Sequence, residues 1–544
     1  MLNFKKSIVG VLTLAAFAFS GNAALAASCP KTGGIMKFGV KAEPPTYDMH
    51  GTNSYAVMHF VAQHYSTLLT FDWNKFPKLE GDVADTWNQS SDGLTYTFKL
   101  KKGIKFHDGT PLTSADVKAT YDRLRNPPKG VISVRKALFS SISSIETPDD
   151  NTVVFKLSKP DAFMMDGFAS PFNAIYSAKD IAKDPKWHLK NINGTGPYKF
   201  IEWVPGDKIV LKANKDYHGA GTGMPQFENV LFKPIKSGPA RIAALLAKDV
   251  DFIDNVPPLN VGKMKNNSSI KLNSGPSNRV IYLHMDQFRE DSPHISAIGG
   301  GKIKNPLMDV RVRKALSLAI NRDAMVAKVM EGIAVKAGQL LPAGFHGVST
   351  KMKPDPYDPD AAKKLLKEAG YGNGFEMTIH GPNDRYINDA KIAEALAQMF
   401  SRIGIKAKVE TMPKAVYFKR ASRGGPNKSP EFSFMVLGWG AGSGEASSPL
   451  RALLHTYDKS IGMGRANRGR HSDPAVDKLV QKALGTVDSD ARGKLLAEAT
   501  EIAVGKNYGV IPIHYQMNTW ASKSGCSYTP RTDERTIATY VSCK

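Results

Sequence analysis

Cysteine is scarce in this sequence, and so are long apolar runs beyond the amino terminus. Three of the 544 residues are cysteines and none forms a C-x-x-C pair, which excludes a zinc site built on paired cysteines. After residue 26 no run is apolar and long enough for a transmembrane helix, so we expect the rest of the chain to be soluble. The remaining composition is that of an ordinary globular protein.

Motifs for catalysis or nucleotide binding are also missing. The glycine-rich stretch LGWGAGSGEAS at 437–447 has no Gly-Lys-Ser/Thr, does not match G-x-G-x-x-G, and does not place Ser443 in a G-x-S-x-G elbow. No H-E-x-x-H is present, and the histidines are dispersed along the chain. The sequence therefore identifies no catalytic residue, no metal site and no cofactor.

The amino terminus has the three parts of a secretory signal. Lys5 and Lys6 precede an apolar stretch at 8–19, and an A-x-A cleavage site ends at Ala26. The alternative, a membrane anchor, is disfavoured because the apolar stretch is short. We therefore expect residues 1–26 to be removed on export and the mature protein to be periplasmic.

An exported protein can form disulfides, and the cysteines allow more than one arrangement. Cys526 and Cys543 bracket the carboxyl-terminal tail, so their pairing closes the shortest loop and is the pairing we predict. Cys29 can instead pair with either of them, or can carry a lipid, although Ala26 is a poor match for the apolar residue of a lipid-attachment site.

The chain is strongly basic, with a formal net charge of +23. Such a charge can indicate nucleic-acid binding. The basic residues are scattered, however, and the densest runs are short, so we interpret them as a solvated basic surface and expect no nucleic-acid partner.

Hydrophobic periodicity predicts an α/β protein with two lobes. A strand at 375–380, a helix at 388–404 and a strand at 405–412 form a βαβ-like unit in the second lobe. The strands around 282–285 and 511–515 are expected to cross between the lobes and act as a hinge.

Two loops follow strands of the second lobe, and both are expected to face one cleft. In open α/β sheets ligands bind beyond the carboxyl ends of the strands. One loop holds Gly438, Trp439 and Gly440, which offer exposed backbone and a flat apolar ring. The other holds Arg385, whose guanidinium suits a carboxylate. The alternatives are a core tryptophan and a surface arginine at a helix start.

Several segments along the chain resemble one family. They look like the family 5 extracellular solute-binding proteins, the dipeptide-, oligopeptide- and nickel-binding receptors of bacterial ABC transporters. The resemblance covers essentially the whole mature chain. The matching segments are 83–124, which resembles the family signature, then 194–200, 309–323, 358–371 and the Gly-Trp pair at 438–439.

The resemblance implies a two-lobed clamshell of the periplasmic-binding-protein type, with an extra subdomain in lobe I. It implies a monomer that encloses its ligand between the lobes and docks on a permease in the inner membrane. The implied division is signal peptide 1–26, lobe I 27–285 with the subdomain at about 51–170, lobe II 286–509, and a return to lobe I at 510–544.

The resemblance also assigns ligand contacts. Arg385 matches the arginine that holds the carboxylate of a bound peptide, and Tyr47 and Tyr515 match positions that line the cleft, although plain packing is an alternative for both. The family aspartate that holds the peptide amine has no counterpart, because no aspartate lies between Gly438 and Asp458. Glu445 is the only acid in that loop, so we expect it to take this role unless the ligand lacks a free amine.

The predicted function is therefore the capture of dipeptides or oligopeptides for an ABC importer. Alternatives in the same role are an opine or other amino-acid conjugate, a sugar, or a metal chelate. A secreted hydrolase and a sensory or chaperone-like periplasmic protein are the alternatives from other classes.

Overall fold

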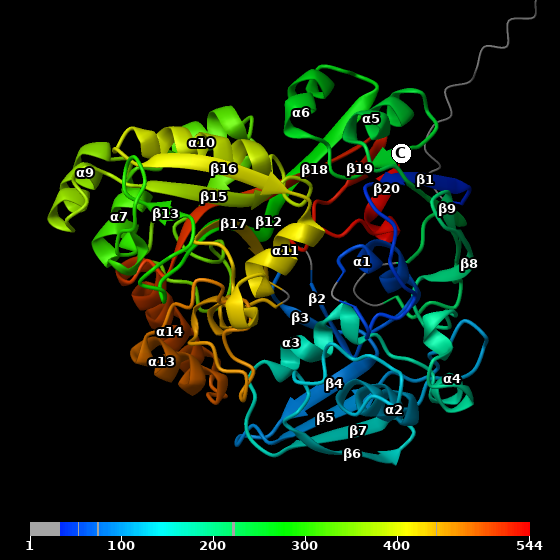
Figure 1. Ribbon diagram of the computed structural model, residues 1–544. Helices are drawn as coiled ribbons and strands as arrows, with labels where there is room; N and C mark the ends of the chain where they lie inside the picture. Colours follow the sequence, from blue (N-terminus) through cyan, green and yellow to red (C-terminus); the bar gives the residue numbers. More distant parts are fainter. Residues whose placement is uncertain (1–32, 53, 73–75, 220–223, 442, 544) are drawn as a thin grey trace, which may run out of the picture.

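The computed structural model describes residues 33–52, 54–72, 76–219, 224–441 and 443–543. The predicted signal peptide and Cys29 lie outside this part of the chain. The described residues form a mixed α/β protein, as the sequence predicts, and Figure 1 shows its two lobes beside a smaller subdomain.

One large sheet passes through both lobes. Its strands are β1 (Ile35–Val40), β8 (Tyr198–Val204), β9 (Lys208–Ala213), β10 (Asn229–Pro234), β11 (Phe252–Ile253), β12 (Ile270–Met285), β13 (Ile295–Ser296), β14 (Ala334–Lys336), β15 (Glu376–Pro382), β16 (Lys406–Met412), β17 (Phe434–Gly440) and β18 (Val510–Lys523). The strand order is β13-β15-β17-β12-β18-β11-β1-β10-β9-β8, with β14 paired to β18 and β16 paired to β15. We call the part from β11 to β8 lobe I and the part from β13 to β17 lobe II.

The long strands β12 and β18 connect the lobes. Residues 270–276 of β12 pair with 517–523 of β18 in lobe I, and residues 280–284 pair with 510–515 in lobe II. The register shifts between these two stretches, and such irregularities bend a strand. β12 and β18 contain the segments around 282–285 and 511–515 that the sequence predicts to cross between the lobes. The hinge role and the lobe boundaries stay predictions.

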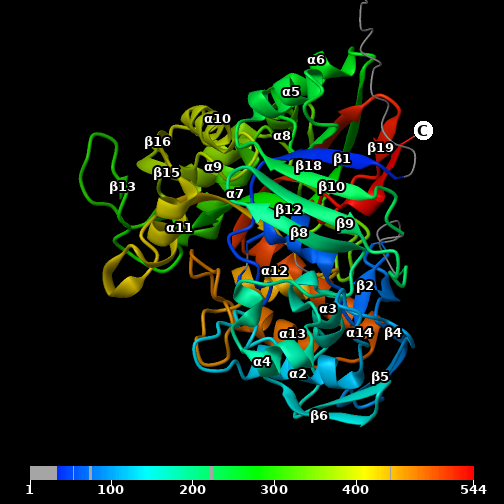
Figure 2. The same ribbon diagram turned by 90° about the vertical axis from the view of Figure 1, so that its right-hand side faces the viewer.

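Helices cover the sheet on both sides (Figures 1 and 2). The α-helices of the described residues, those of the subdomain included, are α1 (Val57–Phe60), α2 (Ser114–Arg125), α3 (Met164–Ala169), α4 (Ala178–Lys183), α5 (Gly238–Leu246), α6 (Pro258–Lys265), α7 (Val310–Leu318), α8 (Arg322–Ala324), α9 (Pro359–Glu368), α10 (Asp389–Ser401), α11 (Lys414–Arg423), α12 (Ser447–Pro449), α13 (Pro474–Leu484) and α14 (Ser489–Thr500).

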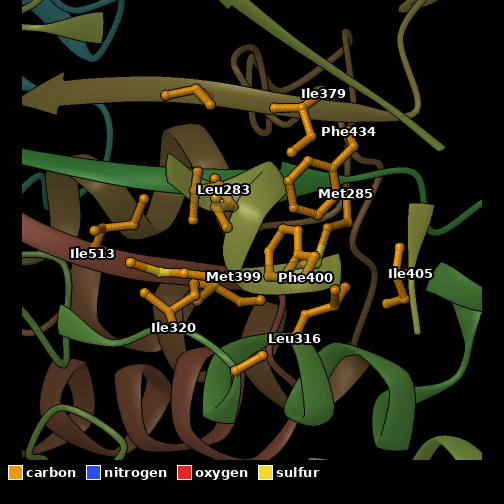
Figure 3. Packing of buried hydrophobic residues seen from close by; sticks show 14 of the residues in the cluster. Leu283, Met285, Leu316, Ile320, Ile379, Met399, Phe400, Ile405, Phe434 and Ile513 are labelled. Carbon is orange, nitrogen blue, oxygen red and sulfur yellow. The ribbon is translucent and has the colours of Figure 1, made fainter. Parts of the chain in front are cut away.

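The core of lobe II lies between the sheet and α10. Leu283 and Met285 of β12 lie against Phe434 of β17 and Phe400 of α10, and all four are fully buried (Figure 3). Burial of such side chains stabilises the fold by about 1.5–3 kcal/mol each. This core fixes α10 behind the parallel strands β15, β16 and β17, and so fixes the loops that follow them.

Lobe I has its own aromatic core, which the carboxyl-terminal tail completes. Phe38 of β1 stacks on Phe232 of β10 at 4.9 Å between ring centroids. Strands β19 (Cys526–Tyr528) and β20 (Val541–Cys543) pair beside this core, and a disulfide joins Cys526 to Cys543.

The subdomain is a four-stranded antiparallel sheet with α2 packed on it, and a separate hairpin of two short strands lies next to α3. Its strands are β4 (Ala84–Gln89), β5 (Thr95–Leu100), β6 (Ile142–Asp149) and β7 (Thr152–Leu157), and the hairpin strands are β2 (Leu69–Phe71) and β3 (Leu79–Gly81). The subdomain contacts lobe II directly, since the rings of Phe76 and Phe345 lie 5.1 Å apart.

Candidate ligand-binding site

A cavity of about 620 Å³ lies between the lobes where β12 and β18 cross. Arg279 of β12 and Gln516 and Asn518 of β18 form part of its wall, and the rest comes from loops of both lobes. A cavity of this size is typical for a small-molecule ligand.

Four of the charged residues in the cavity wall follow the carboxyl ends of parallel strands. In lobe I, Lys41 comes directly after β1 and Asp254 directly after β11. In lobe II, Arg385 follows β15 and Lys414 follows β16. Both lobes therefore use the sheet edge at which α/β proteins bind ligands.

Arg385 is held by the start of α10. The backbone N–H groups of Arg385 and Tyr386 each donate to the Asp389 carboxylate at 2.9 Å, which fixes the loop. The guanidinium lies 5.3 Å from the centroid of the Tyr386 ring. Burial lowers the pKa of Arg385, and the nearby charge of Arg279 lowers it further. The structure thus places this predicted carboxylate anchor in the cavity wall.

Lys41 lies on the lobe I side of the same cavity. Its backbone N–H donates to Asp254 at 2.9 Å, and its side chain is exposed to the cavity. Desolvation by the surrounding protein lowers the pKa of Lys41; Asp254 opposes this, and the positive charges of Arg241, Arg385 and Lys414 add to it. Basic groups from both lobes therefore converge on one space.

Arg279 and Glu534 form a buried ion pair in the cavity wall. Nη2 of Arg279 lies 2.7 Å from Oε2 of Glu534 and Nε lies 3.0 Å from Oε1, while Ser277 donates to the same carboxylate at 2.6 Å. Burial opposes ionisation of Glu534, but the contact with Arg279 prevails and lowers the pKa of Glu534 to about 2. The charges of Arg279 and Glu534 therefore compensate each other.

The glycine stretch lies directly behind the wall. A Cβ on Gly438 would lie 2.6 Å from the Tyr386 ring, and a Cβ on Gly440 would lie 3.1 Å from the Arg279 guanidinium. Glycine is needed at these positions because Tyr386 and Arg279 pack against the end of β17. The two loops do lie side by side, and Tyr386 donates to the Gly438 carbonyl at 3.2 Å.

The described residues of 437–447 are nevertheless not among those that line this cavity. Trp439 is half-buried against an apolar cluster of lobe II that includes Phe345, Leu437 and Leu450. Its indole N–H has no hydrogen-bond partner among the described residues. Glu445 is buried and bound to Arg492 at 3.1 Å, to Ser447, and to His346 at 3.4 Å. The carboxylate expected to face a ligand amine is thus neutralised by the protein.

The two tyrosines contact protein groups rather than the cavity, and Tyr47 is half-buried whereas Tyr515 is buried. Tyr47 lies against Trp203 at 4.7 Å and Phe200 at 5.6 Å between ring centroids. Tyr515 is buried and donates to the carbonyls of Gln339 at 3.0 Å and Leu341 at 2.7 Å. Neither is among the residues that line the described cavity, so the packing alternative describes their positions.

Sequence reasoning missed Lys41, Lys414 and Asp254. The rule that found Arg385 applies to them too, because each follows a parallel strand. What the sequence lacks is the strand order, since β1, β10 and β11 are far apart in the chain and pair only in the folded protein.

The described residues contain no group of three or more His, Cys, Asp or Glu side chains placed to hold a metal ion. No helix among them has the length and apolar character needed to cross a bilayer.

The sequence matches one family over most of its length. The model of the bacterial extracellular solute-binding proteins, family 5 Middle, matches residues 78–460. The chain belongs to this family. A family 5 relative, the glutathione-binding protein GsiB of Pectobacterium atrosepticum, is 31% identical over 79% of this chain and 80% of its own length.

Solved structures of family 5 type agree with the fold. DppA of Helicobacter pylori in complex with the peptide STSA has a TM-score of 0.77 at 25% identity, covering 94% of this chain and 98% of its own. AgaA of A. tumefaciens R10 in complex with agropinic acid has a TM-score of 0.75 at 26% identity, covering 94% and 99%. This family 5 protein is therefore a solute-binding receptor of an ABC transporter and not an enzyme.

Proposed function

We propose that this receptor captures short peptides or peptide-like molecules in the periplasm and delivers them to a permease in the inner membrane. The observation that carries the proposal is the cavity between the lobes, with Arg385 in its wall. A guanidinium presents a planar pair of donors that matches a carboxylate, which every unblocked peptide carries.

The relatives support a ligand of this class. GsiB binds glutathione, DppA holds a four-residue peptide and AgaA holds agropinic acid. A cavity of about 620 Å³ accommodates a short peptide and disfavours a long one.

Capture proceeds by closure of the lobes around the ligand. A ligand that contacts Lys41 in lobe I and Arg385 in lobe II binds the closed form better than the open form, and so shifts the population toward it. The strands β12 and β18 supply the hinge, with the register shift near Pro276 as the bending point. The receptor acts as a monomer.

An amino-acid conjugate such as an opine is the second candidate, and one observation favours it. Glu445, the only acid in the glycine loop, is bound to Arg492, so a peptide amine has no free acid there. A conjugate without a free amine needs no such partner.

Calorimetric titration of the mature protein tests the proposal. The panel contains di-, tri- and tetrapeptides, the same peptides with acetylated amines, and opines. Micromolar or tighter binding of free peptides supports the peptide assignment. Binding restricted to acetylated peptides and opines supports the second candidate. Binding only of sugars or of a metal chelate contradicts both.

A further inference from the structure

The acidic side chains of the cavity wall are already engaged by the protein. Four acids line the cavity, and each accepts a hydrogen bond from a protein donor. They are Glu43 with Trp203 and Gly206, Asp254 with the Lys41 backbone, Asp384 with the Lys414 backbone, and Glu534 with Arg279.

Four of the basic side chains in the wall, in contrast, have no such partner in the part of the chain that the structure describes. Lys41, Lys236, Arg385 and Lys414 all line the cavity, and within the described residues no hydrogen bond or ion pair joins their side-chain nitrogens to a protein acceptor. Two of the lining acids, Asp254 and Glu534, pair with Arg241 and Arg279, which also line the cavity. The other four cations face only the carboxylates of Glu43 and Asp384, so the cavity wall has an excess of positive charge that comes from both lobes.

Two of these cations matter most for closure. Lys41 belongs to lobe I and Arg385 to lobe II, and both line the same cavity. Desolvation is the main cause of the lowered pKa of Lys41; Asp254 opposes it, and the positive charges of Arg241, Arg385 and Lys414 add to it. Closing the lobes brings like charges together and removes water from them, which is unfavourable unless counter-charges lie between them. A zwitterionic peptide has one carboxylate and neutralises only one of these groups.

We infer that the ligand carries two carboxylates, one held by Arg385 and the other by Lys41, so that Lys41 selects peptides or conjugates with two carboxylates over those with one. This inference rests on the proposed function and narrows it. The ligand class is a short peptide or amino-acid conjugate with an acidic side chain or a second terminal carboxylate. Lys414, beside Asp384, adds to the field that favours it.

Calorimetry tests whether Lys41 binds the second carboxylate, by varying both the number of carboxylates on the ligand and the residue at position 41. The probes are glutathione, which has two carboxylates, its glycine amide, which has one, and the peptide pair Ala-Glu and Ala-Gln. The variants are Lys41→Gln and Lys41→Arg. Lys263→Gln on α6 is the matched control, because Lys263 is exposed and is not among the residues lining the cavity. Thermal unfolding establishes that each variant is folded.

We expect wild type to bind each two-carboxylate probe at least ten-fold more tightly than its one-carboxylate partner. Lys41→Gln should reduce this preference to less than about three-fold, Lys41→Arg should retain it, and Lys263→Gln should leave it unchanged. Equal loss for both members of a pair in Lys41→Gln, or no preference in wild type, overturns the inference while peptide binding itself stands. Absence of binding for every peptide and conjugate overturns the proposed function instead.

Discussion

Asp166 of α3 accepts a hydrogen bond of 3.2 Å from the backbone N–H of Gly444, in the loop that follows β17. This bond joins the subdomain to lobe II. It also places the Asp166 carboxyl group near Glu445, which keeps its charge through Arg492 and His346. Burial and the charge of Glu445 raise the pKa of Asp166 to about 7.

The first prediction concerns the pH dependence of this contact. A folded-state pKa above the unfolded value means that the folded protein binds more protons. The contribution of Asp166 is therefore fully present below about pH 4 and is lost as the pH rises through about 7. Asp166→Asn keeps an acceptor for Gly444 and does not titrate.

Thermal unfolding of wild type and Asp166→Asn from pH 5 to pH 8 measures this difference. We expect the Tm of the variant to rise relative to wild type across this range. If the Tm of the two proteins changes with pH in parallel, the assignment is contradicted. Other titrating groups do not affect this comparison, because both proteins contain them.

The second prediction concerns Arg385. Arg385→Ala should weaken peptide binding by about 2 kcal/mol or more, because the ligand carboxylate loses its planar partner. Arg385→Lys should recover only part of this, since lysine cannot form the paired bonds. Calorimetry measures both, with Arg402→Ala, an exposed position at the end of α10, as the control. Unchanged affinity in Arg385→Ala would remove this residue from the site.

The third prediction concerns Gly438, which packs against Tyr386 of the cavity wall. Gly438→Ala places a methyl group 2.6 Å from the Tyr386 ring, which must move and shift the Arg385 loop. We expect a loss of stability of about 1–3 kcal/mol and weaker ligand binding. Gly262→Ala on α6 is the control, since its Cβ meets nothing within 4 Å. Denaturant unfolding and calorimetry should separate the two variants; equal behaviour would argue against the packing account.

The fourth prediction concerns the ion pair between Arg279 and Glu534. Glu534→Gln leaves the buried guanidinium without its counter-charge, and loss of one partner of a buried pair costs about 3–5 kcal/mol. The double variant Arg279→Met with Glu534→Gln should be more stable than the single Glu534→Gln variant. Denaturant unfolding compares the three proteins, and a neutral Glu534→Gln variant contradicts the role of the pair.

The sequence was informative where periodicity and caps act locally. The helix at 359–368 begins after Asp358, whose carboxylate accepts the Ala361 N–H at 2.9 Å, and an aspartate just before a helical pattern is a local start signal. The βαβ-like unit and the shared edge of the two loops also follow from local patterns. Long-range contacts do not: nothing near Glu445 in the chain indicates that Arg492 neutralises it. The glycine loop and Trp439 therefore look like ligand contacts in the sequence, whereas Tyr386 and Arg279 lie between that loop and the cavity.

The central claim is that Arg385 anchors a carboxylate-bearing peptide or conjugate between the lobes. Native mass spectrometry of the mature protein, incubated with a small-molecule extract of the producing cells and then denatured to release its ligand, tests this most directly. The account predicts a released molecule that carries at least one carboxylate and is absent from Arg385→Ala. A released molecule without a carboxylate, or one retained equally by Arg385→Ala, would contradict it.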